Sequence, residues 1–251
     1  MKLPISLVIV TLNEEKNIER CLRSVLWAQD IVVLDSGSQD RTCEIAKSLG
    51  ARVFSEPWKG FGPQKRRAVE LANQDWILSL DADEVLSIEA SHELQEKFKT
   101  MDSKKGYFFP RKSFYLGRWI LHGGWYPDYQ LRLFNRKQSN WDKADIHEKV
   151  QVQVKEKLKN PIEHYVFKDL ADQVETNNRY SSLQAKQHFT KGESFSLFRL
   201  LIKPFSKFIE CYFLKKGIMD GLPGLIIAVG AGYSVFIRWA KVWELEREQK
   251  K

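Results

Sequence analysis

The feature that most constrains the fold of this chain is the alternation of apolar runs and amphipathic stretches near its start. Residues 5–11 form a continuous, largely β-branched run, as expected for a strand that is buried on both faces. In residues 15–27 the apolar side chains recur on one helical stripe, and Asn13 stands where it would cap that helix. The alternation continues, with strands predicted at 31–35, 51–55 and 76–80, helices predicted at 40–49 and 64–73, and a loop indicated by Gly60, Gly62 and Pro63. This βαβαβαβ order predicts an α/β fold, a mostly parallel, doubly wound sheet with helices on both faces.

The middle of the chain, residues 105–155, has a different character. It is rich in aromatic residues and in short strand-like pieces, at 106–109, 129–134 and 149–154. We expect antiparallel strands here that finish the sheet and build the second half of a site.

The C-terminal part combines an amphipathic, basic helix with an uncharged run. A helix is predicted at 170–190, and from Phe195 onward apolar residues fall on one broad helical face beside the basic row Arg199, Lys203 and Lys207. Pro204 should kink or break this second helix. Residues 221–237 carry no charge but fall short of the about 20 apolar residues of a transmembrane helix, so we expect a buried or interfacial helix. The pattern favours contact with an anionic bilayer surface, and packing on the rest of the chain or on another subunit is the alternative.

Charge and cysteine content narrow the class of partner and the compartment. The formal charge of +8 indicates an anionic partner, which leaves nucleotide, phospholipid and nucleic acid open. Nucleic acid is the least favoured, because the basic residues gather beside an apolar face instead of forming a strip with exposed stacking aromatics. Three distant cysteines, Cys21, Cys43 and Cys211, indicate neither a zinc site nor a disulfide framework, so a reducing cytosol is expected. The N-terminal apolar run is short and predicts a strand, not a signal peptide.

Polar side chains follow three of the predicted strands, at the point where each strand ends. The first strand ends in Thr11-Leu12-Asn13-Glu14, the second in Asp35-Ser36-Gly37-Ser38, and the fourth in Asp81-Ala82-Asp83. Ligands of open α/β sheets bind beyond the carboxyl ends of the strands, and a parallel sheet brings these three ends to one edge. Each tripeptide or tetrapeptide alone would be an ordinary turn, whereas their convergence predicts a site.

The ordered combination of these segments resembles family 2 glycosyltransferases with the GT-A fold. The segments are PISLVIVTLNEEKNI, IVVLDSGSQDRT and WILSLDADE, with the basic block FGPQKRRAVELA before the last of them. The resemblance covers roughly residues 4–155. The branch that this chain resembles is the bacterial lipopolysaccharide-core β-1,4-glucosyltransferases, on the segments YPDYQLRLFNR and DIHEKV and on the aromatic, basic tail. It implies a GT-A catalytic domain over 1–165, with a nucleotide-sugar half at 1–100 and an acceptor half at 101–165, and a helical, membrane-associating region at 166–251.

The resemblance further implies a UDP-sugar donor, an inverting transfer and a divalent cation, Mg²⁺ or Mn²⁺. Such a cation takes hard oxygen ligands and neutralises the departing diphosphate. Asp83 is the expected direct ligand, while Asp81 would face the ribose or reach the metal through water, and a capping turn is the structural alternative. Donor contacts are expected from the three strand ends and from two basic or polar regions, at Thr11, Leu12, Asn13, Glu14, Asp35, Lys65, Ala82, Gln130 and Arg132.

Several of these positions also have a structural interpretation. Asp35 would accept a hydrogen bond from the uracil ring, or else only form an Asx turn before Gly37. Asn13 would border the ribose or only cap a helix. Lys65 matches the basic position of the family, but Arg66 departs from its usual asparagine. Gln130 and Arg132 share one strand face, where Arg132 would bind the diphosphate or form a cross-strand ion pair.

An inverting transfer needs one base to take the proton of the acceptor hydroxyl. In this branch the base would be Glu148, with His147 orienting it, contacting a phosphate or binding the metal, and with Asp145 as a rival base. Trp125 would stack on an acceptor sugar or belong to a core.

The leading hypothesis is a hexosyltransferase with UDP-glucose as the expected donor. The acceptor would be a lipid-anchored saccharide of the lipopolysaccharide inner core, and the enzyme would be a peripheral protein at the cytoplasmic face of the bacterial inner membrane. A polyprenyl-phosphate sugar transferase and a catalytically silent membrane-binding module are the alternatives.

Overall fold

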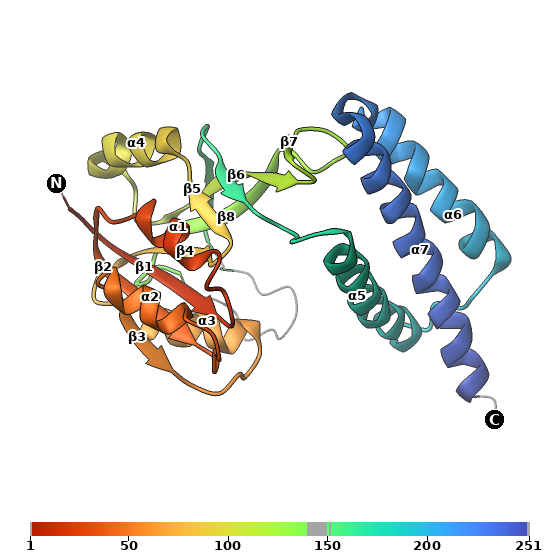
Figure 1. Ribbon diagram of the computed structural model, residues 1–251, viewed down its shortest axis with the longest axis horizontal. Helices are drawn as coiled ribbons and strands as arrows, with labels where there is room; N and C mark the ends of the chain where they lie inside the picture. Colours follow the sequence, from red (N-terminus) through yellow and green to blue (C-terminus); the bar gives the residue numbers. More distant parts are fainter. Residues whose placement is uncertain (1, 140–149, 151, 250–251) are drawn as a thin grey trace. The chain divides into compact units, whose positions relative to one another are not determined.

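The computed structural model describes residues 2–139, 150 and 152–249 (Figure 1). It contains two compact units. The first consists of Met1–Arg111 and Asp128–His164, and the second of Lys112–Pro127 and Tyr165–Lys251. Residues 112–127, which we expected in the acceptor half, therefore cluster with the C-terminal helices, while the predicted division into functional halves stays a prediction.

The first unit is built on a parallel four-stranded core, as the sequence predicts. Strand β1 (Leu3–Thr11) pairs in parallel with β2 (Ala28–Asp35) and with β4 (Trp76–Asp81), and β3 (Arg52–Ser55) extends the sheet beyond β2. The helices of this unit are α1 (Ile18–Arg23), α2 (Thr42–Ser48), α3 (Phe61–Glu70) and α4 (Ile88–Lys97), which continues into a short 3₁₀ turn, Phe98–Thr100.

Alternate residues of β1 point to opposite faces of the sheet, and each face is covered. Ile5, Leu7 and Ile9 pack with buried residues of α1, α2 and α4, while Val8 packs with Ala68 and Val69 of α3. Burial on both faces is the reason that the strands are nearly continuous apolar runs.

Antiparallel strands complete the sheet. Strand β8 (Asp128–Asn135) lies between β4 and β6 (Lys105–Tyr115) and runs antiparallel to both. The short strands β5 (Glu84–Leu86) and β10 (Ile162–His164) pair antiparallel with each other. The strand predicted at 149–154 lies partly outside the described residues, and the observed strand β9 (Val154–Lys157) begins later and pairs in parallel with β6, so an all-antiparallel completion is wrong.

Two local predictions near the parallel core are also wrong. Asn13 does not cap a helix, because α1 begins only at Ile18 and Asn13 has a left-handed backbone with φ of 56°. The predicted loop at Gly62 and Pro63 is the first turn of α3, where a proline costs no hydrogen bond since the first N–H groups of a helix have no partner within it.

The second unit is a set of three helices with a short hairpin of strands. Helix α5 (Leu170–Thr190) has the predicted bounds, and α7 (Gly221–Gln249) packs against both α5 and α6 (Leu197–Ile209). Strand β7 (Arg118–Ile120) pairs antiparallel with the end of β6. Pro204 lies inside α6 and does not break it, because residues on both sides of the proline, such as Leu200 and Phe208, pack toward α7.

The uncharged run 221–237 is the first part of a much longer helix. Among the residues that the structure describes, the segment Gly217–Gln249 is the one helix long and apolar enough to cross a membrane by length and composition. The core helix of a soluble protein can pass the same test, so this finding alone does not distinguish a span from a packed helix.

A buried carboxylate, Asp30, ties the first unit together at the end of the sheet away from the polar strand ends. It accepts hydrogen bonds from the Ser6 hydroxyl at 2.6 Å, the Asn73 backbone N–H at 2.8 Å and the Arg52 guanidinium at 2.9 Å. Burial would raise the pKa of Asp30, but Arg52, Ser6 and Asn73 together hold it below its ordinary value.

We expect Asp30→Asn to lower the free energy of unfolding by about 1–3 kcal/mol near neutral pH, because it leaves charged and polar partners unsatisfied. The folded pKa is depressed, so the contribution of Asp30 is complete above the unfolded pKa of about 3.9 and is lost as the pH falls through the folded value. Urea denaturation of both proteins across the acid range should show their difference shrinking below about pH 4. A difference that stays constant would contradict this assignment.

Candidate active site

The polar strand ends meet at one edge of the sheet, as predicted. In the strand register Thr11 lies opposite Asp35, and Val10 lies opposite Asp81. The loop after β1 is fastened to the loop after β2, since the Asn13 N–H donates to the Ser38 hydroxyl and the Gln39 N–H donates to the Asn13 side chain, both at 2.8 Å.

Asp35 is occupied by its own turn. Its carboxylate accepts the N–H groups of Gly37 and Ser38, both at 2.9 Å, and the Ser38 hydroxyl at 2.5 Å. The turn-forming interpretation of Asp35 therefore describes what the chain itself does, and a contact with a uracil ring stays a prediction.

The end of β1 presents one apolar and one unsatisfied polar group. Thr11 is buried, and its hydroxyl has no hydrogen-bond partner among the described residues. The next residue, Leu12, is 51% exposed. Glu14 is held in the chain, with its N–H donating to the Thr42 hydroxyl and its carboxylate accepting from Asn17. A buried hydroxyl without a partner is costly, so a ligand that bonds Thr11 and covers Leu12 would be stabilised here.

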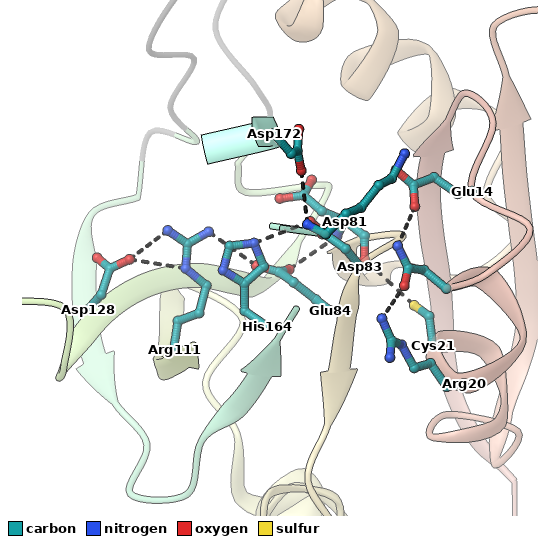
Figure 2. A network of polar contacts seen from close by, with 12 residues as sticks. Glu14, Arg20, Cys21, Asp81, Asp83, Glu84, Arg111, Asp128, His164 and Asp172 are labelled. Carbon is teal, nitrogen blue, oxygen red and sulfur yellow. Dashed lines mark hydrogen bonds and ion pairs between the residues drawn. The ribbon is translucent and has the colours of Figure 1, made fainter. Parts of the chain in front are cut away.

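A dense cluster of charges surrounds Asp81 at the end of β4 (Figure 2). The Arg132 guanidinium of β8 lies 2.6 Å from the Asp81 carboxylate, and the Lys65 ammonium of α3 lies 3.3 Å from it. Burial would raise the pKa of Asp81, but Arg132, Lys65 and Arg111 outweigh it and hold this pKa far below its ordinary value. Asp81 is therefore ionised at neutral pH, and Arg132 forms the cross-strand ion pair that the sequence offered as an alternative.

Glu84 contacts both arginines of this cluster and the backbone of Asp81. Its carboxylate is fully buried, lies 2.6 Å from Arg132 and 3.5 Å from Arg111, and accepts the Asp81 N–H at 3.1 Å. Arg111 is held on its other side by Asp128 at 2.6 Å (Figure 2). The guanidinium of Arg132 is thus fixed between two carboxylates.

The second aspartate of the segment, Asp83, pairs with a histidine. Its carboxylate is 3.3 Å from Nε2 of His164, which stands opposite Glu84 in the pairing of β10 with β5 (Figure 2). The residue between the two aspartates, Ala82, is buried in the core and holds the turn in place.

The pair of Asp83 and His164 fits a divalent cation with few protein ligands. Within the described parts of the chain no group of three or more His, Cys, Asp or Glu side chains could hold a metal. Mg²⁺ and related ions, however, often take one or two protein ligands together with phosphate oxygens and water. Two adjacent ligand atoms of an octahedral ion, each about 2.1 Å from it, lie about 3 Å apart. The distance of 3.3 Å between the Asp83 carboxylate and Nε2 of His164 is close to that value.

A cavity of about 390 Å³ opens beside the cluster, which is a size typical of small-ligand sites. Its walls are basic and aromatic, with one carboxylate: Lys65, Asp81, Phe108, Arg111, Tyr129, Gln130, Leu131, Arg132, Val150 and Lys155. Gln130 and Arg132 line it together, and the Gln130 amide donates to Asp128. Four basic side chains against one acid predict an anionic ligand.

Three predicted residues lie outside the described residues: Glu148, His147 and the rival base Asp145. Trp125 lies in the second unit, where it stacks on Tyr115 with 5.8 Å between ring centroids and packs against an apolar cluster. Its role toward an acceptor stays a prediction.

Sequence reasoning missed Glu84, Arg111 and His164 as members of this cluster. Glu84 is visible as the third carboxylate of the DADE segment, but its burial depends on arginines far along the chain. His164 carries no local motif, and its approach to Asp83 follows only from the pairing of β10 with β5.

Comparison with known proteins gives the class of this protein. The pattern of the family described as Glycosyl transferase family 2 matches residues 6–153. An uncharacterized glycosyltransferase of Rickettsia typhi is 31% identical over 98% of this chain and 89% of its own length. The chain belongs to glycosyltransferase family 2. Its mixed, helix-covered sheet with a parallel core is the GT-A fold, followed by a long apolar C-terminal helix.

Two further proteins are similar to this chain. The lipopolysaccharide core biosynthesis glycosyltransferase LpsC of Rhizobium meliloti is 29% identical over 97% of this chain and 93% of its own length. Among solved structures, glucosyl-3-phosphoglycerate synthase of Mycobacterium tuberculosis, solved with Mn²⁺, UDP and glucosyl-3-phosphoglycerate, is 30% identical with a TM-score of 0.36. That match covers 45% of this chain and 44% of the other.

Proposed function

We propose that this chain is an inverting, metal-dependent glycosyltransferase that moves glucose from UDP-glucose to a saccharide of the lipopolysaccharide inner core. The observation that carries the proposal is the basic cavity lined by Asp81, Lys65 and Arg132 at the carboxyl edge of the sheet. Similarity to LpsC over nearly the whole chain supports a lipopolysaccharide core acceptor.

The donor would be held by groups that the fold has already positioned. Thr11 and the exposed Leu12 would border the nucleoside, and Lys65 and Arg132 would face the diphosphate across the cavity. Asp83, with His164 beside it, would hold Mg²⁺ or Mn²⁺. When bound, that cation neutralises charge on the departing diphosphate.

The transfer itself would be a displacement at the anomeric carbon of glucose. Glu148 would take the proton of the acceptor hydroxyl while the new carbon–oxygen bond forms and the bond to the diphosphate breaks, releasing UDP. His147 would orient Glu148. Attack opposite the leaving group of an α-linked donor gives a β-linked product.

The acceptor would be a lipid-anchored saccharide, so the enzyme would work at the cytoplasmic face of the bacterial inner membrane as a peripheral protein. The long apolar helix of the second unit is consistent with that location.

Calorimetric titration tests the donor site directly. UDP-glucose should bind the wild type only with Mn²⁺ or Mg²⁺ present, and Asp83→Ala should weaken this binding by about 100-fold, because it removes an oxygen ligand. Asp102→Ala, which removes an exposed carboxylate in the turn before β6, serves as the matched control and should bind as the wild type does. A wild type that binds neither UDP nor UDP-glucose under any condition would refute the proposed function.

A further inference from the structure

Helix α6 has an apolar face that no other described residue of the second unit covers. The helix lies wholly within the described residues, and none of its thirteen residues is buried. Leu197, Phe198, Leu201, Ile202 and Phe205 are all exposed, at the spacing of one helical face, with Leu201 59% and Phe205 66% exposed. The exposed apolar surface continues into the following turn, where Leu214 is 75% exposed.

The seam between α6 and α7 is built in the opposite way. Gly224, Ala228 and Gly232 recur at every fourth position of α7 and are buried. A Cβ atom at Gly232 would lie 3.0 Å from the carbonyl oxygen of Pro204 in α6. One at Gly224 would lie 1.9 Å from the carbonyl oxygen of Gly217, in the 3₁₀ turn Gly217–Asp220 that leads into α7. Gly232 thus lets the backbones of α6 and α7 approach closely, and Trp239 fills the contact further along beside Leu200. The large apolar side chains of the outer face of α6 take no part in this contact and stay exposed.

The segment that carries this face has a net basic charge. Residues 197–220 contain five basic residues, Arg199, Lys203, Lys207, Lys215 and Lys216. The two acidic residues of the segment are engaged within the chain, Glu210 by Lys207 and Lys215, and Asp220 by Arg118 and His122. Arg199 and Lys203 lie over the Trp239 ring of α7, on the side of α6 away from its exposed apolar face. The net basic charge of the segment is complementary to anionic lipid headgroups.

The surroundings of α7 argue against a span across the bilayer. Gly230 lies beside the side-chain amides of Gln173 and Asn177 on α5. Further along, the Lys241 ammonium donates to Asn178, Ser181 and Ser182 of the same helix. A spanning helix would need about 20 residues in an apolar setting, whereas α7 meets polar groups of α5 at Gly230 and again at Lys241.

We infer that the outer face of α6 and the turn at 210–220 insert in the plane of an anionic bilayer surface, without crossing it. The inserted side chains are the exposed Leu201, Phe205, Phe213, Leu214 and Met219, and Lys216 lies at the level of the headgroups. The inference deepens the peripheral location given in the proposed function and rests on it only for the identity of the membrane.

This surface is tied to the segment that we expected to bind the acceptor. The buried Asp220 carboxylate accepts the N–H of His122 at 2.8 Å, and the Gly123 N–H donates to the Lys215 carbonyl at 2.8 Å. Trp125 follows directly in the same compact unit. Insertion of the turn would therefore hold this segment at the membrane surface, where a lipid-anchored saccharide is presented.

Flotation with vesicles tests the inference on the full chain. The wild type should float with vesicles of phosphatidylethanolamine and phosphatidylglycerol and much less with phosphatidylcholine alone. The double variant L201D/F205D should lower the partition constant by about tenfold or more, because two inserted apolar side chains are lost. Lys216→Gln should lower it about fivefold. Ile88→Asp, at a 73% exposed apolar position on α4, is the matched control and should float as the wild type does.

Several results would overturn the inference. These are a wild type that does not float, equal flotation with both vesicle types, or a double variant that floats unchanged. Light scattering that shows the double variant breaking a dimer, without vesicle binding by the wild type, would assign the face to a second copy. Resistance to alkaline extraction would indicate a span. Vesicle binding without UDP binding would refute the donor site alone, and UDP binding without vesicle binding would refute this inference alone.

Discussion

Glu84→Gln should lower the free energy of unfolding by about 3–5 kcal/mol, the range found when one partner of a buried ion pair is removed. Glutamine keeps the size of the side chain but not its charge. Arg132 is 4% exposed, and its Nε has no hydrogen-bond partner among the described residues. Within that part of the chain it would keep only Asp81 as a close anion. Burial would lower the pKa of Arg132, but Asp81 and Glu84 raise it above its ordinary value, so the arginine stays charged and its loss of a counter-charge is costly.

Urea denaturation measures this loss, with Glu96→Gln as the control. Glu96 is an exposed carboxylate on α4, and its replacement should change stability by no more than about 0.5 kcal/mol. Because Glu84 also accepts the Asp81 N–H, the variant should bind UDP-glucose more weakly even where it is folded. Equal stability of Glu84→Gln and the control would mean that Arg132 does not depend on Glu84.

The parts of the fold that were predictable are those in which one short segment carries its own signal. The parallel strands are buried on both faces, so their sequences are continuous apolar runs, and the polar residues that end them mark the edge where ligands bind. Asp81 and Asp83 were visible for this reason. Helix α5 was predicted with its observed bounds, and the Asp169 side chain caps its start by accepting the Asp172 N–H.

The parts that were not predictable depend on contacts between distant segments. Asn13 follows the first strand in a position typical of a helix cap, yet its bonds go to the loop after β2. Glu84 is a turn residue by sequence, and only the approach of Arg132 and Arg111 makes it a buried anchor. His164 meets Asp83 through the pairing of two three-residue strands, which are too short to show a periodic pattern.

Glu148→Gln should reduce kcat by about 10²–10⁴-fold while leaving the affinity for UDP-glucose within about twofold, because it removes a general base and preserves its size. The chain shortly after Glu148 reaches the donor cavity, since Val150 lines it together with Lys65 and Asp81. In the wild type, kcat/KM should rise with pH through the pKa of the free base and then level off. The variant should lose this rise, and Asp145→Asn, which removes the rival carboxylate, should retain it.

The outcome also separates the two kinds of acceptor that fit this donor site. A sugar hydroxyl must lose a proton as it attacks, so its transfer depends on a base, whereas a lipid phosphate is already ionised and needs little such help. A large loss of kcat in Glu148→Gln, with donor binding intact by calorimetry, would favour a saccharide acceptor. Full activity of this variant with a polyprenyl phosphate, and none with a lipopolysaccharide core saccharide, would refute the proposed acceptor while leaving the donor site in place. Loss of the pH-dependent rise in Asp145→Asn instead would move the role of the base to that residue.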